Sequence, residues 1–477
     1  MKHQDDKEAV QAIRELAQRT LSRVAGAPLV SGNYVRLLRD ATENYPAWLE
    51  AINAAKERIH FESYIIHEDE IGNEFANVLM TKAREGVHVR VIYDWLGGLG
   101  NASRHFWGRL REGGVEVRCY NPPRFDSPFG WLSRDHRKVL VIDGRVGFVT
   151  GLCVGKMWVG YPEKNIPPWR DTGIELRGPA LADVERAFSE IWAQLGTPIP
   201  EKELTGDYRP VSSGGVNVRI IASMPATAGM LRIDQFVAAL ARKRLWLSDA
   251  YYGGTTSYVQ ALRAAARDGV DVRLLLPNAT DIPLLQPFSR SGYRALLEAG
   301  VRVFEWNGPM MHAKTAVADS SWARVGSTNL NIASWFGNCE LDAVIADESF
   351  AREMEDMYLQ DPTNATEVVL DAKQKVRAPN EPAHPFASST GGGSAGRAAA
   401  GAVRISNAIG AAFTNRRELG PVEARLMIII GVLLLGLAFL FGHFPRALAV
   451  PIVVVFVWIA AALFYRAVKL YRQQKRI

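Results

Sequence analysis

The octapeptide HRKVLVID at residues 136–143 returns as HAKTAVAD at residues 312–319. Both fit one pattern, His-x-Lys followed by four residues and Asp. A single match of this kind is expected by chance in roughly a few chains per hundred, but two matches in one chain indicate a duplicated unit. Apart from Thr315, the residues between Lys and Asp are apolar in both octapeptides. We therefore expect a buried strand on which His and Lys, two residues apart, project from the same face.

Two such strands related by a pseudo-twofold axis would bring both His–Lys pairs into one site. Two ammonium groups can hold phosphoryl oxygens, and two imidazoles can supply a nucleophile and a general acid. The sequence shows no cluster with metal-ligand spacing, so we expect phosphoryl transfer without a metal or any other cofactor. The predicted catalytic residues are the defining positions of the two patterns, namely His136, Lys138, Asp143, His312, Lys314 and Asp319.

The surroundings of the two octapeptides also repeat. AREGVHVRVIY at residues 83–93 is matched by AARDGVDVRLL at residues 265–275. In both, we expect a helix to end at a glycine, Gly86 or Gly269, before a Val-rich strand, because glycine suits the left-handed position after a helix. Short β-type runs alternate with helical stretches between residues 34 and 371, which predicts an α/β fold. The expected strands are 58–66, 88–93, 115–120, 139–142, 216–221, 245–251, 270–276, 301–305 and 315–317. The expected helices are 7–24, 73–85, 180–194, 257–267 and 292–299.

Charge is divided unevenly along the 477 residues, whose net charge is +6. Residues 372–477 contain 14 Lys or Arg and 3 Asp or Glu, a net of +11. Residues 1–371 then hold the remaining 42 basic and 47 acidic residues, a net of −5. Because nucleic-acid binding draws its affinity from many phosphate contacts, the acidic body argues against a nucleic-acid partner. The three cysteines are too few for a disulfide framework.

The basic tail has the composition of a membrane anchor. Residues 378–401 are rich in Ala, Pro, Gly and Ser, as in flexible linkers. Residues 404–420 have the spacing of an amphipathic helix that lies on a membrane surface, although a helix packed on the body is an alternative. The runs 426–442 and 447–465, of 17 and 19 residues without a charge, predict a transmembrane hairpin rather than a buried soluble one. Their basic flanks place both ends, and hence the body, in the cytoplasm.

The expected organisation follows from these patterns. It comprises an N-terminal helix and lead-in (1–31), two similar halves (32–200 and 201–371), a flexible linker (372–403), an amphipathic interfacial helix (404–420), a transmembrane hairpin (425–466) and a basic cytoplasmic tail (467–477).

The duplicated pattern resembles that of the phospholipase D superfamily, over about residues 32–371. The resemblance implies two α/β/α halves related by pseudo-twofold symmetry. In the family the pattern continues with Gly-Ser-x-Asn, in which the Asn helps to hold the phosphate. The second half matches with Ser327 and Asn329, but the first half has TGLC at residues 150–153. The resemblance therefore implies an asymmetric site, with Cys153 as a non-equivalent substitute for Asn. A buried packing role is commoner for such a cysteine than a nucleophilic one.

The family also orients each catalytic imidazole through a downstream carboxylate. The resemblance implies Glu340 as the partner of His312, and Asp171, within WRDT at residues 169–172, as the partner of His136. Such a carboxylate fixes the tautomer of the imidazole and stabilises its charged form. An ordinary surface or capping carboxylate is the alternative for each acid.

Within the superfamily, the sequence is most similar to bacterial cardiolipin synthases. The matching pieces are Glu62-Ser63-Tyr64, Asp69, Gly72, Asp94, WRDT at 169–172 and Glu305-Trp306. The resemblance implies a phosphatidyltransferase with a phosphohistidine intermediate, in which His136 is the nucleophile and His312 the general acid. It also implies phospholipid substrates, chiefly phosphatidylglycerol, and membrane association. Together with the basic flanks of the apolar runs, this predicts a bacterial inner-membrane location with the catalytic body facing the cytoplasm. A phospholipase D hydrolase, a nuclease of the same superfamily and an inactive membrane scaffold remain alternatives, and the second lipid substrate is left open.

Apolar residues precede both octapeptides. They are candidates for contacts with acyl chains, with core packing as the alternative. These residues are Phe125, Phe129, Trp131, Leu132, Trp306, Met310 and Met311.

Overall fold

The computed structural model describes residues 19–124, 132–204, 212–282, 285–370 and 421–474. The chain divides into two units. The body comprises Met1–Tyr120 and Asp135–Thr414, and the second unit comprises Asn121–Arg134 and Asn415–Ile477. The predicted linker at 372–403, the amphipathic helix at 404–420 and most of the leading helix at 7–24 lie outside the described residues.

The body is built on a sheet that contains fifteen strands among the described residues. The strands of the first half are β1 (Val30–Arg39), β2 (Arg58–Ser63), β3 (His88–Asp94), β4 (Glu116–Tyr120), β5 (Lys138–Ile142), β6 (Val146–Thr150) and β7 (Thr172–Arg177). Those of the second half are β8 (Val216–Ser223), β9 (Arg244–Ser248), β10 (Asp271–Pro277), β11 (Arg302–Trp306), β12 (Thr315–Ala318), β13 (Trp322–Gly326), β14 (Glu340–Ala346) and β15 (Ala365–Val368).

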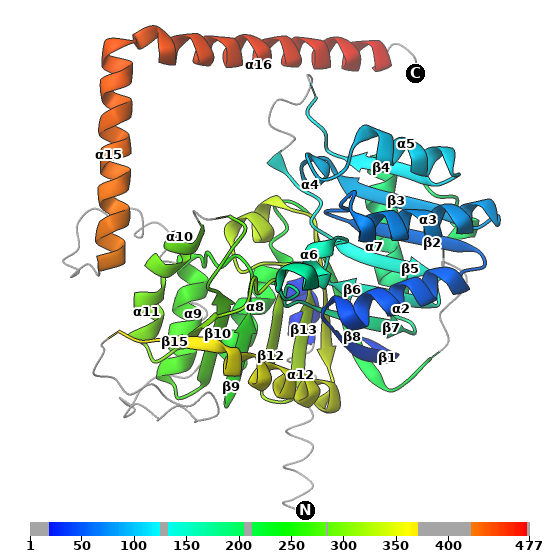
Figure 1. Ribbon diagram of the computed structural model, residues 1–477, viewed down its shortest axis with the longest axis horizontal. Helices are drawn as coiled ribbons and strands as arrows, with labels where there is room; N and C mark the ends of the chain where they lie inside the picture. The colour runs from blue at the N-terminus through cyan, green and yellow to red at the C-terminus, as the bar shows by residue number, and fades with distance from the viewer. Residues whose placement is uncertain (1–18, 125–131, 205–211, 283–284, 371–420, 475–477) are drawn as a thin grey trace, which may run out of the picture. The chain divides into compact units, whose positions relative to one another are not determined.

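The order of these strands confirms the predicted repeat. From the antiparallel pair β1–β8 at the centre, one direction runs β7, β6, β5, β2, β3, β4 and the other runs β14, β13, β12, β9, β10, β11. Each strand of the first half thus has a counterpart seven places later in the chain, and β15 is an addition at the edge of the second half. The two halves are therefore α/β units of the same topology, joined along β1 and β8 (Figure 1).

Helices cover both faces of each half. The first half has α2 (Asp40–Ala54), α3 (Glu70–Arg84), α4 (Trp95–Gly98), α5 (Arg104–Glu112), α6 (Lys156–Val159) and α7 (Leu181–Gln194). The second has α8 (Gly229–Leu240), α9 (Thr256–Arg267), α10 (Leu285–Ser291), α11 (Tyr293–Leu297) and α12 (Glu348–Gln360). Short helical turns are η2 (Pro162–Lys164), η3 (Glu201–Glu203), η4 (Ala333–Gly337) and η5 (Asp361–Asn364).

Both faces of the octapeptide strands are buried, which explains why the residues after Lys138 and Thr315 are all apolar rather than alternating. In β5, Val139 and Val141 enter a central core that both halves share, with α7 and α12, while Leu140 and Ile142 enter an outer core under α2, α3 and α5. In β12, Val317 enters the shared core. The shared core buries the octapeptides of the two halves between the same layers.

The predicted strands and helices of the body are confirmed, apart from their exact ends. The two glycines expected after helices lie just beyond α3 and α9, with φ of +91° at Gly86 and +90° at Gly269. A residue with a Cβ rarely adopts this conformation, so the matching glycines record the same helix-to-strand turn in each half.

The second unit contains α15 (Pro421–His443) and α16 (Pro445–Gln474), separated by Phe444. These helices cover the two apolar runs expected to form a hairpin. Many of their large apolar side chains are exposed, among them Leu435, Phe456 and Phe464. In the described part of the chain, no helix combines the length and the apolar composition required to cross a membrane.

Candidate active site

Strand register places the start of each octapeptide strand at the carboxyl ends of the neighbouring parallel strands. Lys138 at the start of β5 lies opposite Ser63 at the end of β2, and Thr315 at the start of β12 lies opposite Ser248 at the end of β9. Each His therefore lies just outside the sheet, at the carboxyl ends of the parallel strands of its half. Active sites of α/β folds usually lie at these strand ends.

The backbone N–H of each His is hydrogen-bonded to the other half of the molecule. The peptide N–H of His136 donates to the carbonyl of Cys339 at 2.9 Å, and that of His312 donates to the carbonyl of Arg170 at 2.7 Å. Each octapeptide thus enters its strand alongside the segment that leads into β14 or β7 of the opposite half. Both contacts follow from the pseudo-twofold arrangement, which places equivalent segments across the seam.

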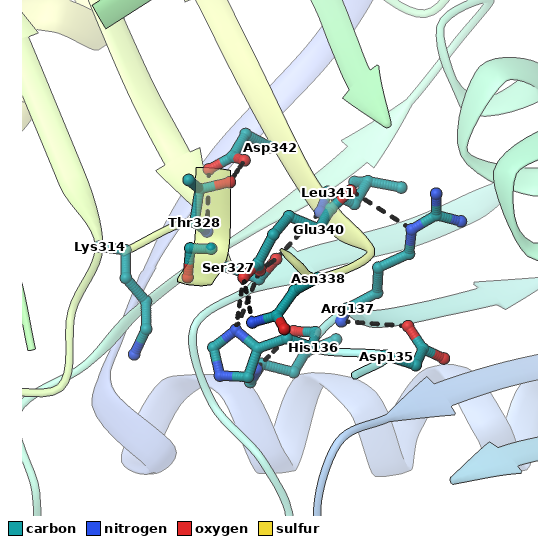
Figure 2. A network of polar contacts seen from close by, with 12 residues as sticks. Asp135, His136, Arg137, Lys314, Ser327, Thr328, Asn338, Glu340, Leu341 and Asp342 are labelled. Carbon is teal, nitrogen blue, oxygen red and sulfur yellow. Dashed lines mark hydrogen bonds and ion pairs between the residues drawn. The ribbon is translucent and has the colours of Figure 1, made fainter. Parts of the chain in front are cut away.

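The crossed segments correct the predicted pairing of acids with imidazoles. His136 Nδ1 lies 2.9 Å from a Glu340 oxygen, and His312 Nδ1 lies 2.6 Å from Asp171 Oδ2. The expectation that Glu340 serves His312 and Asp171 serves His136 is therefore wrong, because each acid reaches across the seam. Figure 2 shows the Glu340 carboxylate facing His136, with Ser327 beside it.

Strand register shows that the two acids occupy equivalent positions. Gly326 of β13 lies opposite Asp342, two residues after Glu340, and Thr150 of β6 lies opposite Gly173, two residues after Asp171. The pairs Gly326–Asp342 and Thr150–Gly173 are equivalent in the two halves, and each acid stands two residues before the second member of its pair. Both acids are fully buried.

Each carboxylate is held by a third side chain, but a different one in each half. Ser327 Oγ donates to Glu340 at 2.5 Å, and Asn338 also donates to it at 3.3 Å. Asp171 instead accepts from the indole N–H of Trp158 at 3.2 Å. Ser327 therefore acts behind Glu340, and its hydroxyl is not directed at a phosphate.

The loss of serine in the first half has a steric cause. Gly151 stands where the second half has Ser327, and a Cβ at Gly151 would overlap Asp171 Oδ1. The shorter acid brings its carboxylate onto the space that a serine side chain would fill. Glycine in TGLC and aspartate in WRDT are therefore a matched pair, as are serine and glutamate in the second half.

The two lysines are buried beside their histidines. Lys138 Nζ donates to the carbonyl of His136 at 2.5 Å, and Lys314 Nζ likewise donates to the carbonyl of His312. Lys314 Nζ also lies 3.0 Å from Nδ1 and 3.1 Å from Nε2 of the His312 ring. Lys138 Nζ instead lies 5.4 Å from the centre of the Tyr64 ring. The second half thus has an ammonium group directly against its imidazole.

Electrostatics couple the four groups into one site. Burial, and then the charge of Lys314, lowers the pKa of His312 to about 4 against the opposing effect of Asp171. Burial also lowers the pKa of His136 against Glu340, and both Lys138 and Lys314 lower it further. Burial lowers the pKa of Lys314 to about 8. Each lysine also lowers the pKa of the histidine of the opposite half, so the two His–Lys pairs lie close enough to influence each other's protonation.

The carboxylates remain ionised in this environment. Burial alone would raise the pKa of Asp171 and of Glu340, but the facing histidine and lysine charges hold both pKa values below the usual range. Each neutral imidazole then donates its Nδ1–H to a carboxylate, which leaves the Nε2 lone pair for chemistry.

Aromatic residues that sequence reasoning did not assign to the site surround the histidines. Tyr64 packs edge-on against His136 at 5.0 Å between ring centres. Trp158, Trp169 and Tyr251 pack against His312 at 5.6, 5.5 and 6.0 Å. Tyr64 and Trp169 stand within the stretches similar to cardiolipin synthases, but nothing in the sequence distinguishes Trp158 or Tyr251.

Asp143 and Asp319 are not catalytic residues, contrary to prediction. Each lies at the far end of its strand, about 16 Å from the lysine at five residues of roughly 3.3 Å each. Asp143 accepts the backbone N–H groups of Lys56, Glu57 and Arg58. Asp319 does the same for Arg242, Lys243 and Arg244. Both therefore tie the loop ahead of a neighbouring strand, β2 or β9, to the octapeptide.

The remaining predicted residues divide between site and core. The amide of Asn329 is 3% exposed, and its oxygen has no hydrogen-bond partner among the described residues. Cys153 is buried in the outer core, and burial raises the pKa of its thiol, which argues against a thiolate nucleophile. Among the described residues, no cluster of His, Cys, Asp and Glu is arranged to hold a metal ion.

The candidates for acyl-chain contacts ahead of the second octapeptide are mostly wrong. Met310 and Met311 are buried at 1% and 0% exposure, and only Trp306 is half-buried. Ahead of the first octapeptide, Leu132 is exposed, and Phe125, Phe129 and Trp131 lie outside the described residues.

Comparison with known proteins places these features in a family. The family model described as "Cardiolipin synthase, PLD-like domain" matches residues 48–156 and 233–361, each of which contains one octapeptide. The cardiolipin synthase of Alkalihalophilus pseudofirmus is 32% identical over 359 residues, which cover 74% of this chain and 71% of that protein. Cardiolipin synthase A of Pseudomonas fluorescens is 33% identical over 369 residues, 75% of this chain and 74% of that protein.

A solved structure agrees with the fold. The crystal structure of phosphatidylserine synthase from Haemophilus influenzae superposes with a TM-score of 0.58 at 15% identity, and the match covers 74% of this chain and 92% of that one. At this identity the likeness concerns the fold of the body.

Proposed function

The chain belongs to the cardiolipin synthase family of phospholipase D-like phosphatidyltransferases, and on this premise we propose a ping-pong transfer between phospholipids through a phosphohistidine intermediate. The observation that carries the proposal is the pair of crossed His–carboxylate contacts, beside which each histidine has a lysine. This arrangement provides two oriented imidazoles and two phosphate-binding charges.

In the first half-reaction, His136 Nε2 attacks the phosphorus of phosphatidylglycerol. An N–P bond forms as the P–O bond to glycerol breaks, and His312 gives its proton to the departing oxygen. Lys138, Lys314 and the amide of Asn329 hold the phosphoryl oxygens, where charge accumulates in the transition state.

In the second half-reaction, neutral His312 takes the proton from a hydroxyl of a second phosphatidylglycerol. That oxygen attacks phosphorus, the N–P bond breaks, and cardiolipin leaves with His136 restored. Family usage assigns His136 as nucleophile, and the position of Lys314 against the His312 ring supports it, because an ammonium group there hinders attack by that imidazole.

The low pKa of His312 fits this assignment once substrate is bound. A phosphate anion between the lysines offsets the charge of Lys314, which raises the pKa of His312 and lets it carry the proton for the leaving group. The same anion leaves the Glu340–His136 contact in place, because that contact involves Nδ1 alone.

Lipid mass spectrometry tests the reaction. Purified chain in detergent is incubated with phosphatidylglycerol, and the expected products are cardiolipin and glycerol. Phosphatidic acid as the sole product would instead identify a hydrolase that uses the same residues with water as acceptor. Replacing the second lipid with labelled phosphatidylethanolamine or with small alcohols measures the preference for the acceptor.

We further propose that the apolar segments within α15 and α16 insert in the bacterial inner membrane, with the catalytic body in the cytoplasm. The support is the exposed apolar surface of these helices and the basic residues at their ends, which favour an anionic cytoplasmic leaflet. Retention in membranes after alkaline carbonate extraction tests insertion. Release by carbonate would exclude a spanning hairpin, and protease protection of the body in inverted vesicles would exclude the orientation.

A further inference from the structure

We propose that a group of exposed apolar side chains, on loops at the end of the strands that carries the histidine site, enters the surface of a lipid bilayer. The inference deepens the proposed function and rests on it, since it names the phase in which the lipid substrate is presented. This group, termed here the apolar rim, consists of Leu96, Leu99, Ile166, Ile282, Phe288, Ile332 and Phe336.

The rim lies on loops at the edge of the sheet that holds the histidines. Leu96 and Leu99 follow β3, which runs parallel to β2 and ends at the same edge. Ile282 and Phe288 follow β10, the counterpart of β3 in the second half. In Figure 1, α4 and α10, which contain Leu96 and Phe288, lie toward the upper side of the body.

The other rim residues also lie in loops that connect strands at the histidine end of the sheet. Ile166 lies between β6 and β7, and Ile332 and Phe336 lie between β13 and β14. These two connections also contain Asp171 and the segment leading to Glu340. The rim is thus duplicated by the same pseudo-twofold symmetry as the site, with equivalent loops of both halves contributing.

Exposure is concentrated at this edge. The seven rim side chains are 39–64% exposed, with Ile332 the highest at 64%. Among the large apolar residues that are exposed elsewhere in the described body, Tyr34, Leu240 and Leu370 belong to other places in the fold. Single exposed apolar residues are ordinary, but a group of them on neighbouring loops at one end of the strands indicates an interaction surface.

A bilayer is the occupant that suits this position. Lys138 and Lys314, which hold the phosphate in the proposed function, are buried at the end of the strands from which the rim loops extend. The acyl chains of a bound lipid would therefore leave the site past these loops. A rim in contact with the bilayer lets these chains stay in an apolar phase throughout. A protein bound to the same loops would instead block the approach of lipids to the histidines.

Fluorescent labels on the full chain test the contact. Leu99→Cys and Ile332→Cys are each made in a Cys119→Ser background, whose other cysteines are buried, and labelled with an environment-sensitive dye. Leu240→Cys is the matched control, because Leu240 is 44% exposed at the end of α8, ahead of β9 and away from the site edge. The protein is reconstituted in vesicles of equimolar phosphatidylcholine and phosphatidylglycerol.

We expect the labels at 99 and 332 to shift to shorter emission wavelengths and to be quenched by lipids brominated on their acyl chains. The label at 240 should keep the emission wavelength of an aqueous environment and should not be quenched by the brominated lipids. Rim labels that stay in an aqueous environment would overturn the proposal even if the wild-type enzyme makes cardiolipin. Embedded rim labels on a protein that makes no cardiolipin would refute the proposed function and leave the bilayer contact standing.

A kinetic ratio gives a second test. In Phe288→Ser/Ile332→Ser, activity on vesicle lipid is expected to fall roughly tenfold relative to activity on a short-chain, monomeric phosphatidylglycerol, because two apolar contacts with the bilayer are lost. Leu240→Ser should leave this ratio at the wild-type value. An unchanged ratio in the double variant would contradict the proposal.

Discussion

In the first half of the site, His136 donates to Glu340, which accepts from Ser327; in the second, His312 donates to Asp171, which accepts from Trp158. The geometry of a carboxylate held behind an imidazole is the same, but the side chains that hold it differ. A longer acid is combined with serine and a shorter acid with glycine. The duplicated fold therefore preserves the position of the charge, whereas the residues that supply it have diverged.

The lysines differ in the same way. Lys314 lies against both nitrogens of His312, while Lys138 is directed toward the carbonyl of His136 and the ring of Tyr64. The two imidazoles are thus placed alike, but only His312 has an ammonium group against its ring, which suits two different roles in one reaction.

The largest expected effect comes from removing either histidine. His136→Ala and His312→Ala should each lower kcat for transfer by about 10⁴-fold or more. The first variant loses the nucleophile and the second loses the general acid and base, and water replaces neither group effectively. The exposed His105→Ala is the control and should keep wild-type activity.

A substrate with a nitrophenol leaving group separates the two roles. It needs no general acid, so His312→Ala should still form a trapped phosphatidyl-enzyme, whereas His136→Ala should not. The reverse result would exchange the roles of the two histidines.

The crossed contacts are tested by the amides of the two acids. Glu340→Gln and Asp171→Asn should each lower kcat by roughly 10²–10⁴-fold, because an amide no longer orients the imidazole and stabilises its charge. In a His312→Ala background, intermediate formation from the nitrophenyl substrate should be insensitive to Asp171→Asn and sensitive to Glu340→Gln. The opposite sensitivity would show that Asp171 orients His136 and Glu340 orients His312, within their own halves.

Smaller losses are expected from the residues behind the acids. Ser327→Ala and Trp158→Phe each remove one hydrogen bond to a buried carboxylate, so kcat/KM should fall roughly 10- to 100-fold. The pKa of the affected carboxyl rises, because its charged form has lost a donor, and the acidic limb of the pH profile of kcat/KM moves upward. A loss of activity with an unmoved pH profile would indicate a packing role instead.

Stability should depend on pH through His312. Its pKa is about 4 in the folded chain, below the unfolded value, so the unfolded state binds the extra proton as pH falls from about 6.5 toward about 4. Folding is therefore disfavoured by about 2 kcal/mol between roughly pH 7 and pH 5 from this group. Denaturant unfolding of wild type and of His312→Gln measures the difference, and equal pH slopes for the two proteins would falsify the expectation.

Asp143→Ala and Asp319→Ala are expected to change activity least. Each removes an acceptor for three backbone N–H groups, which lowers the free energy of unfolding by about 1–3 kcal/mol. Folded protein should keep kcat within roughly threefold, since neither acid lies near the histidines. A loss of kcat comparable with that of the histidine variants, in protein that remains folded, would return these residues to the catalytic set.

Much of the body could be predicted from local pattern. The apolar run after each lysine specifies a strand buried on both faces, and the glycines after α3 and α9 specify the same turn twice. Duplication of His-x-Lys then indicates one site formed by two halves, because equivalent residues of a pseudo-symmetric pair lie near its axis. The strands that were not predicted are β1, β6, β7, β13, β14 and β15. Whether such a segment becomes a strand is decided by pairing partners that are distant in the sequence.

By itself, the sequence determined the duplicated α/β fold and the two His–Lys pairs, since two-residue spacing on a strand places both side chains on one face wherever the strand lies. Only the tertiary structure decided which acid serves which imidazole, because Glu340 and Asp171 reach the histidines across the seam between halves. It also decided that Asp143 and Asp319 tie loops, since five residues of extended chain separate them from the site. Spacing along the chain fixes neighbours within a strand, and contacts between strands depend on how the halves pack.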